Sequence, residues 1–175
     1  TYTIDDLVVH KIHPLSFRLF ILGAHYRTPQ NFTWEAVGAS HTALGNIRDA
    51  VRELPKPHGE PDAPSIERFM DRMNDDLDTP GALAIFYGVL NDEAMEGGTK
   101  AATLLKMDEV LGLALEDVLA RPVSVPAAIE KLVADREAAR NEKDWKTSDA
   151  IRDEIALLGY VVEDTTNGQR VKEQW

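Results

Sequence analysis

Residues 136–153, with the sequence REAARNEKDWKTSDAIRD, determine the most distinctive part of the predicted fold. Apolar residues continue at helical spacing on both sides of this stretch. We therefore expect one helix over residues 127–141 and a second over residues 145–158, joined by a tight turn and stopped by Gly159. The inward-facing residues predicted for the second helix are Ile151, Ile155 and Leu158.

Charged side chains and a large aromatic residue gather at the turn of this helical hairpin. The second helix places Asp149 and Arg152 within about 60° of Trp145 on one face. Aromatic rings and guanidinium groups stack on unpaired bases, and carboxylates accept hydrogen bonds from base edges. The pattern therefore indicates either a site for single-stranded RNA, or a salt bridge between Arg140 and Asp149 with Trp145 packed at the hinge.

After the second helix the pattern changes to that of a β-hairpin. Residues 160–164 and 169–175 favour strands, and the Asn167-Gly168 step between them is a strong turn signal. Upstream, residues 121–126 have the composition of a linker. We therefore predict a separate small unit over residues 127–175, made of two helices and a C-terminal β-hairpin.

The first 120 residues show the spacing of an antiparallel helical bundle, so the predicted fold class is mainly α. Five helices are expected. The first begins at Pro14 and ends before Arg27–Pro29, the second begins after a Thr33 cap, and the third begins after a Ser65 cap. The fourth runs from a Thr79 cap and Pro80 to Gly97-Gly98, and the fifth runs from Lys100 to Leu111 before Gly112. The residues assigned to their buried stripes are Leu15, Leu19, Leu22, Tyr26, Val37, Leu44, Ile47, Val51, Leu54, Phe69, Met73, Leu77, Leu83, Phe86, Tyr87 and Leu90.

The composition limits the classes of function. The 175-residue chain has no Cys, which favours a reducing cytoplasm, and no apolar run approaches the roughly 18 residues of a membrane span. Its net charge of −11 argues against nucleic-acid binding. However, residues 130–152 hold six basic and six acidic side chains, so the acidic excess lies elsewhere. The first residues lack an initiator Met and an export signal, and we expect a longer protein upstream of them.

No catalytic or metal-binding constellation is visible in the sequence. It has neither a glycine-rich phosphate loop nor a His-Glu-x-x-His motif. His10 and His13 lack a third nearby ligand, and residues 75–78 lack the Gly and the distal Glu of a calcium loop. We therefore expect no catalytic residue, no metal and no cofactor in this chain.

Several phrases, in order, resemble the C-terminal half of the cysteinyl-tRNA synthetases, a family of class I aminoacyl-tRNA synthetases. Within these phrases two positions depart from the family pattern, because His13 replaces an acidic residue and Asp78 replaces Asn. The phrases that carry the resemblance are His13–Arg18, Ala24–Arg27, Asn31-Phe32, Trp34-Glu35, Met73–Leu83, Arg136–Asp153 and Glu163–Thr165.

The resemblance implies a bundle of the anticodon-binding type in residues 1–120, in contact with the tRNA stem, and an anticodon-binding module in residues 127–175. Trp145 would stack on a base, whereas the other anticodon-binding residues would pair with base edges. The implied anticodon-binding residues are Arg140, Trp145, Asp149 and Asp164, with Arg136, Lys143 and Arg152 as weaker candidates for RNA backbone contacts. The final hairpin departs from the family, because Val171 stands where an aromatic residue is usual.

The resemblance also implies a parent enzyme that activates L-cysteine with ATP and transfers it to the 3′ end of cysteine tRNA. Its ATP and zinc sites would lie in a catalytic domain outside this chain. The chain itself would then be an inactive monomer, whose partners are cysteine tRNA and that catalytic domain.

Two alternatives stand beside this interpretation. The first is the C-terminal bundle of a mycothiol-pathway cysteine ligase, a relative without an anticodon module. The second is an acidic helical protein-interaction module that binds no RNA, which would suit the net charge.

Overall fold

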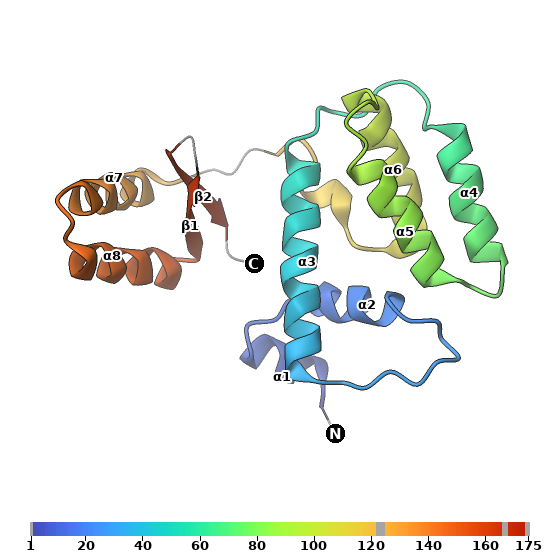
Figure 1. Cartoon of the computed structure of the whole chain (residues 1–175), viewed down its shortest axis with the longest axis horizontal. Helices are drawn as coiled ribbons and strands as arrows, with labels where there is room; N and C mark the ends of the chain where they lie inside the picture. The colour runs from blue at the N-terminus through green and yellow to red at the C-terminus, as the bar shows by residue number, and fades with distance from the viewer. Residues whose placement is uncertain (1, 122–124, 166–167, 174–175) are drawn as a thin grey trace. The chain divides into compact units, whose positions relative to one another are not determined.

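The computed structural model describes residues 2–121, 125–165 and 168–173. Over these residues the chain forms eight α-helices, one short 3-10 helix and one two-stranded antiparallel sheet (Figure 1). The chain divides into two compact units, residues 1–121 and residues 122–175. The prediction of a mainly helical fold with a C-terminal β-hairpin is confirmed.

The first unit is helical over its described residues. Helix α3 packs on α2, and α5 packs on both α4 and α6. The elements are α1 (Ile4–Val9), α2 (Pro14–Leu22), α3 (Trp34–Arg52), α4 (Ala63–Asn74), α5 (Thr79–Leu90), α6 (Gly97–Leu111) and the 3-10 helix η1 (Leu115–Asp117).

The core of this unit follows the predicted helical stripes in its central helices. Thr33 caps α3 as expected, with its side chain accepting a hydrogen bond from the Ala36 amide. Gly112 ends α6 in the left-handed conformation that glycine adopts without strain. Predicted stripe residues that are fully buried are Val37, Leu44, Ile47, Val51, Phe69 and Phe86.

Two helix starts differ from the prediction by one to three residues. The side chain of Asp62, not Ser65, caps α4 and accepts a hydrogen bond from the Ser65 amide at 3.0 Å. Similarly, Asp78 rather than Thr79 caps α5, accepting from the Gly81 amide at 3.0 Å. Asp caps a helix as well as Ser or Thr does, so local sequence alone did not distinguish these neighbouring candidates.

Two residues assigned to buried stripes lie at the surface. Helix α2 ends at Leu22, several residues before the predicted stop, and Tyr26 is 59% exposed. Leu77 is 53% exposed, because it lies in the turn after α4 with a positive φ of 56°. A stripe extrapolated past the true helix end places its last residue outside the core.

Two further helix boundaries differ from the prediction. Gly97 and Gly98 begin α6 rather than closing α5, because the Glu96 carboxylate accepts hydrogen bonds from the Gly98 and Thr99 amides, both at 2.9 Å. Helix α1 was not predicted. Its signal is the capping box between Thr3 and Asp6, a recognisable start for a short helix.

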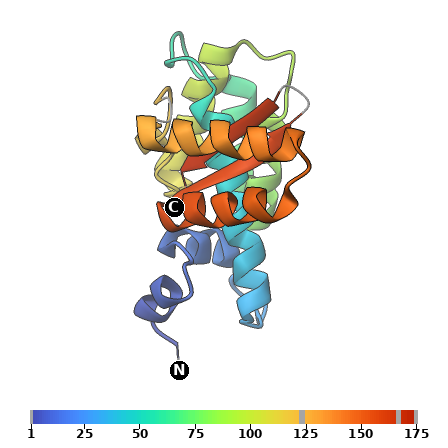
Figure 2. The ribbon, with the colours of Figure 1, turned by 90° about the vertical axis from the view of Figure 1, so that its left-hand side faces the viewer.

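The second unit consists of α7 (Ala127–Asn141), α8 (Trp145–Leu157), β1 (Tyr160–Thr165) and β2 (Gly168–Glu173). The two helices lie side by side (Figure 2). The strands pair antiparallel from Tyr160 opposite Glu173 to Thr165 opposite Gly168. Both predicted helices are confirmed to within one residue. Asn167 of the predicted turn and Trp175 lie outside the described residues.

The core of the second unit is small. Ile129 of α7, Ile155 of α8 and Val162 of β1 are buried. Leu158, predicted to face inward, is instead 53% exposed, because α8 ends before it and Leu158 is only the C-cap residue.

Candidate nucleic-acid interface

The turn between α7 and α8 presents Trp145 to solvent. Asp144 caps α8, with one carboxylate oxygen accepting from the Thr147 amide at 3.1 Å and the other from the Thr147 hydroxyl at 2.7 Å. These hydrogen bonds favour the ionised carboxylate, so the pKa of Asp144 lies below its usual range. The cap begins the helix at Trp145, which is 55% exposed. An exposed indole at this position is available for stacking.

Arg140, at the end of α7, lies against this indole. Its guanidinium carbon is 5.7 Å from the centroid of the Trp145 ring, within the range of a cation–π contact. Its Nη1 also lies 3.2 Å from Oδ2 of Asp164 on β1. The structure therefore brings three of the predicted anticodon residues, Arg140, Trp145 and Asp164, into one connected group.

Arg136 lies beneath this group rather than at the surface. It is 3% exposed and donates two hydrogen bonds to the Asp164 carboxylate, at 2.9 and 3.1 Å. This paired arrangement holds the pKa of Asp164 below its usual range, with the hydrogen bonds from Arg136 as the largest cause. Arg136 was expected to touch the RNA backbone, and its burial against Asp164 argues against that role.

Asp149 lies on α8, one helical turn after Trp145, and is exposed. Its Oδ1 is 3.2 Å from Nη1 of Arg152, which is itself exposed. Within the described residues, no ion pair joins Arg140 to Asp149, since each pairs with a different partner. The alternative of a salt bridge between these two residues is therefore wrong for this structure.

Gln169, which no sequence pattern singles out, also contacts Arg136. Its side-chain oxygen accepts a hydrogen bond from Arg136 Nη1 at 2.6 Å. The strand register places Gln169 directly opposite Asp164. Only knowledge of that register would have linked the two positions.

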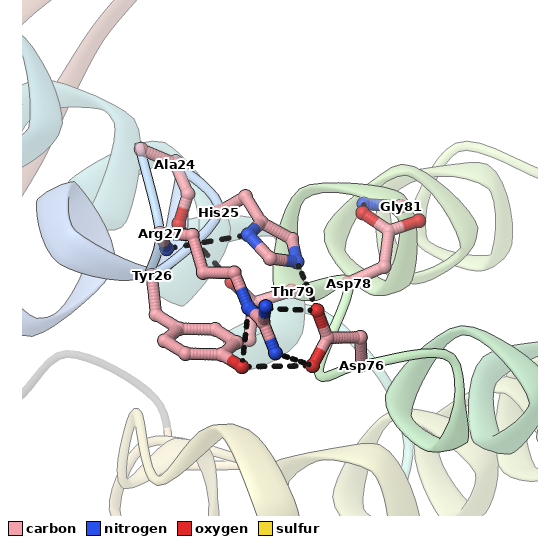
Figure 3. A network of polar contacts seen from close by, with 8 residues as sticks. All are labelled: Ala24, His25, Tyr26, Arg27, Asp76, Asp78, Thr79 and Gly81. Atoms are coloured by element: carbon pink, nitrogen blue, oxygen red, sulfur yellow. Dashed lines mark hydrogen bonds and ion pairs between the residues drawn. The ribbon is translucent and has the colours of Figure 1, made fainter. Parts of the chain in front are cut away.

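A second polar group lies in the first unit, where the segment after α2 meets the turn before α5 (Figure 3). The carboxylate of Asp76 accepts hydrogen bonds from the Tyr26 hydroxyl at 2.7 Å and from Arg27 Nη2 at 3.0 Å. His25 Nε2 lies 3.7 Å from the same carboxylate. These contacts join two connecting segments of the bundle.

Neither a metal site nor a membrane-spanning helix is found among the described residues. Among the residues it describes, no three His, Asp or Glu side chains are grouped so as to hold a metal ion. None of the described helices is both long and apolar enough to cross a membrane.

Comparison with known proteins identifies the family. Residues 123–171 match the model described as the cysteinyl-tRNA ligase anticodon binding domain. The chain is 38% identical over 160 residues to cysteine–tRNA ligase 1 of Burkholderia lata, a match that covers 91% of this chain and 34% of that protein. It is 39% identical over 167 residues to the cysteine–tRNA ligase of Novosphingobium aromaticivorans, a match that covers 87% of this chain and 34% of that protein. For the cysteine–tRNA ligase of Thermus thermophilus the identity is 35% over 191 residues, and the match covers 95% of this chain and 39% of that protein.

These matches place the chain in the class of the aminoacyl-tRNA synthetases. Within that class it belongs to the cysteine–tRNA ligase family, and it spans between a third and two fifths of the length of these relatives. The match to an anticodon-binding domain covers most of the second unit. That region is the part that a mycothiol-pathway ligase would lack, so this alternative is not supported.

Proposed function

We propose that residues 127–173 bind the anticodon arm of cysteine tRNA through the surface formed by Arg140, Trp145, Asp149 and Asp164. The observation that carries this proposal is the exposed Trp145 ring, with the Arg140 guanidinium beside it, the Asp164 carboxylate against that guanidinium and Asp149 one helical turn further along α8. Anticodon bases are unpaired, and unpaired bases are recognised by stacking together with hydrogen bonds to their edges.

Each residue has a distinct role in this proposal. Trp145 stacks on one base, and stacking is tolerant of base identity because every base has a π-face. Asp149 accepts hydrogen bonds from the edge of a base, for which guanine offers two adjacent donors. Arg140 donates to a second base edge. Asp164, whose side chain is 44% exposed, orients Arg140 and pairs with a base edge through its exposed part.

Lys143 and Arg152 are proposed to contact the RNA backbone. Both side chains are exposed, with Lys143 in the turn and Arg152 on the same face of α8 as Trp145 and Asp149. Two cations there offset the acidic net charge locally, because charge interactions at a surface are screened beyond about 10 Å in ordinary salt.

The remaining assignments concern the whole enzyme. Residues 1–120 are proposed to contact the tRNA stem and to orient the anticodon module. A catalytic domain outside this chain is proposed to bind ATP and zinc, to activate L-cysteine and to transfer it to the tRNA. The present chain is then catalytically inactive alone, and we propose that it is a cytoplasmic monomer.

A fluorescence titration tests the proposal. The ligand is the labelled anticodon stem-loop of cysteine tRNA at low salt, compared with the same stem-loop carrying a substituted anticodon. We expect binding that weakens by at least tenfold with the substituted loop. Failure to bind, or equal binding of both RNAs, would contradict anticodon recognition and favour an acidic interaction module.

A further inference from the structure

The buried guanidinium of Arg136 has no part in the surface that we propose to contact RNA. Arginine is almost never fully buried unless it is paired. Here both terminal nitrogens are paired: Nη1 donates to Asp164 Oδ1 at 2.9 Å and to Gln169 at 2.6 Å, and Nη2 donates to Asp164 Oδ2 at 3.1 Å. Its Nε is buried without a hydrogen-bond partner. The group is therefore directed at the hairpin and away from solvent.

Arg136 contacts both strands of the hairpin at one cross-strand pair. Asp164 on β1 and Gln169 on β2 lie directly opposite each other. Side chains two residues apart on a strand point to the same face, so Asp164 shares the inward face with the buried Val162. A two-stranded hairpin is only marginally stable alone, and Arg136 fastens this one to α7.

The same carboxylate also determines where Arg140 lies. Asp164 Oδ2 accepts from Arg136 Nη2 at 3.1 Å and lies 3.2 Å from Arg140 Nη1. Arg140 in turn lies beside the Trp145 ring. Polar contacts thus run from the buried Arg136 through Asp164 to the exposed aromatic. An arginine held before binding loses less side-chain entropy when its ligand arrives.

We propose that Arg136 is a positioning residue for RNA recognition: it holds Asp164, and through Asp164 the guanidinium of Arg140, in the orientation used for binding, without touching the RNA. The inference rests on the proposed role of Arg140 and Trp145 in anticodon binding. It assigns to Arg136 a function different from the phosphate contact that its position near the basic end of α7 suggests.

Substitution of Arg136 by Met tests this role, because Met preserves much of the apolar volume and removes the hydrogen bonds. Asp164 is half exposed, so water can solvate it once Arg136 is gone. In stem-loop titrations, we expect Arg136→Met to weaken binding about tenfold and to reduce discrimination against a substituted anticodon. Arg136→Lys keeps the charge but loses the paired geometry, so its affinity for the stem-loop should lie between those of Arg136→Met and the unchanged protein. Lys131→Met, on the same helix and exposed, is the matched control for lost charge.

Two measurements separate positioning from direct contact. In an Arg140→Ala background, Arg136→Met should weaken binding by less than it does in the unchanged protein, because the part of its effect that passes through Arg140 is already lost. The slope of log affinity against log salt should match that of the Lys131→Met control. An undiminished effect in the Arg140→Ala background, or a slope lowered relative to that control, would overturn the inference in favour of an independent phosphate contact.

An RNA-free measurement keeps this test distinct from that of the proposed function. NMR of arginine side chains reports how freely each guanidinium rotates. We expect restricted rotation of Arg140 in the unchanged chain and free rotation after Arg136→Met, with the melting temperature of Arg136→Met showing that the module stays folded. An Arg140 signal that does not change on Arg136→Met would overturn the inference. Failure of the unchanged chain to bind RNA would instead overturn the proposed function.

Discussion

The guanidinium of Arg140 lies 5.7 Å from the ring centroid of Trp145, although four residues and a change of helix separate them in the chain. The contact forms because α7 ends at Asn141 and α8 begins at Trp145, so the tight turn brings the two ends together. It joins a planar cation to an exposed aromatic ring at a point where the RNA would approach.

Trp145→Ala should weaken binding of the anticodon stem-loop by about 1–3 kcal/mol, the usual contribution of one base–aromatic stack. Because the side chain is 55% exposed, the melting temperature should change little. Trp145→Phe retains a ring and should keep most of the affinity. Equal affinity for the Ala and Phe variants, measured by fluorescence anisotropy, would show that no base stacks here.

Asp149→Ala should weaken binding of the native anticodon by roughly 1–3 kcal/mol and relax discrimination at a single base, as expected when a base-edge contact is lost. Asp153→Ala is the matched control, since Asp153 lies one turn further along α8, is exposed and also approaches Arg152, at 3.9 Å. Titrations against stem-loops substituted at each anticodon position locate the base. A loss of helicity with unchanged binding would make Asp149 a structural residue.

Lys143→Gly should stabilise the chain and weaken RNA binding at the same time. Lys143 has a φ of 62°, a left-handed conformation that costs a side chain about 1 kcal/mol and glycine almost nothing. Loss of one phosphate contact should lower the salt slope of binding by about 1. Lys143→Asn, which tolerates this conformation, should behave similarly. Urea denaturation and salt-dependent titration measure the two effects, and an unchanged salt slope would exclude the contact.

The stability of the first unit should fall as the pH drops below about 6.5, the ordinary pKa of histidine. Burial lowers the pKa of both His13 and His41. Each is therefore neutral when folded but takes up a proton when unfolded in mildly acidic solution, so the stabilisation is complete above that pH and declines through the lowered pKa values. Nδ1 of His13 also caps α2 by accepting from the Leu15 amide at 3.2 Å, which requires the unprotonated nitrogen.

His13→Asn isolates this effect, because Asn is an excellent helix cap and does not titrate. The free energy of unfolding should match that of the unchanged chain at pH 8 and decline less at pH 5.5. Denaturant titrations at the two pH values measure the difference. Parallel declines in the two proteins would show that His13 contributes nothing to the pH dependence.

Much of the small second unit follows directly from the sequence. The limits of α7 and α8 are local properties: Asp144 caps one helix, and the apolar positions repeat at the helical period in both. The same holds for the strands. Caps were less certain in the first unit, where Asp62 and Ser65, or Asp78 and Thr79, offer equally good oxygens within a few residues of each other.

Tertiary structure alone decided the partners of the charged residues. The sequence determined that Arg136, Arg140 and Asp149 stand near the turn of a helical hairpin, and a bridge between Arg140 and Asp149 was a reasonable expectation. Instead, the β-hairpin folds back so that Asp164 pairs with both Arg136 and Arg140. Asp149 pairs with Arg152. Helical periodicity reports the face on which a side chain lies. Which distant carboxylate reaches that face depends on strand register and packing, and these form only when the whole unit folds.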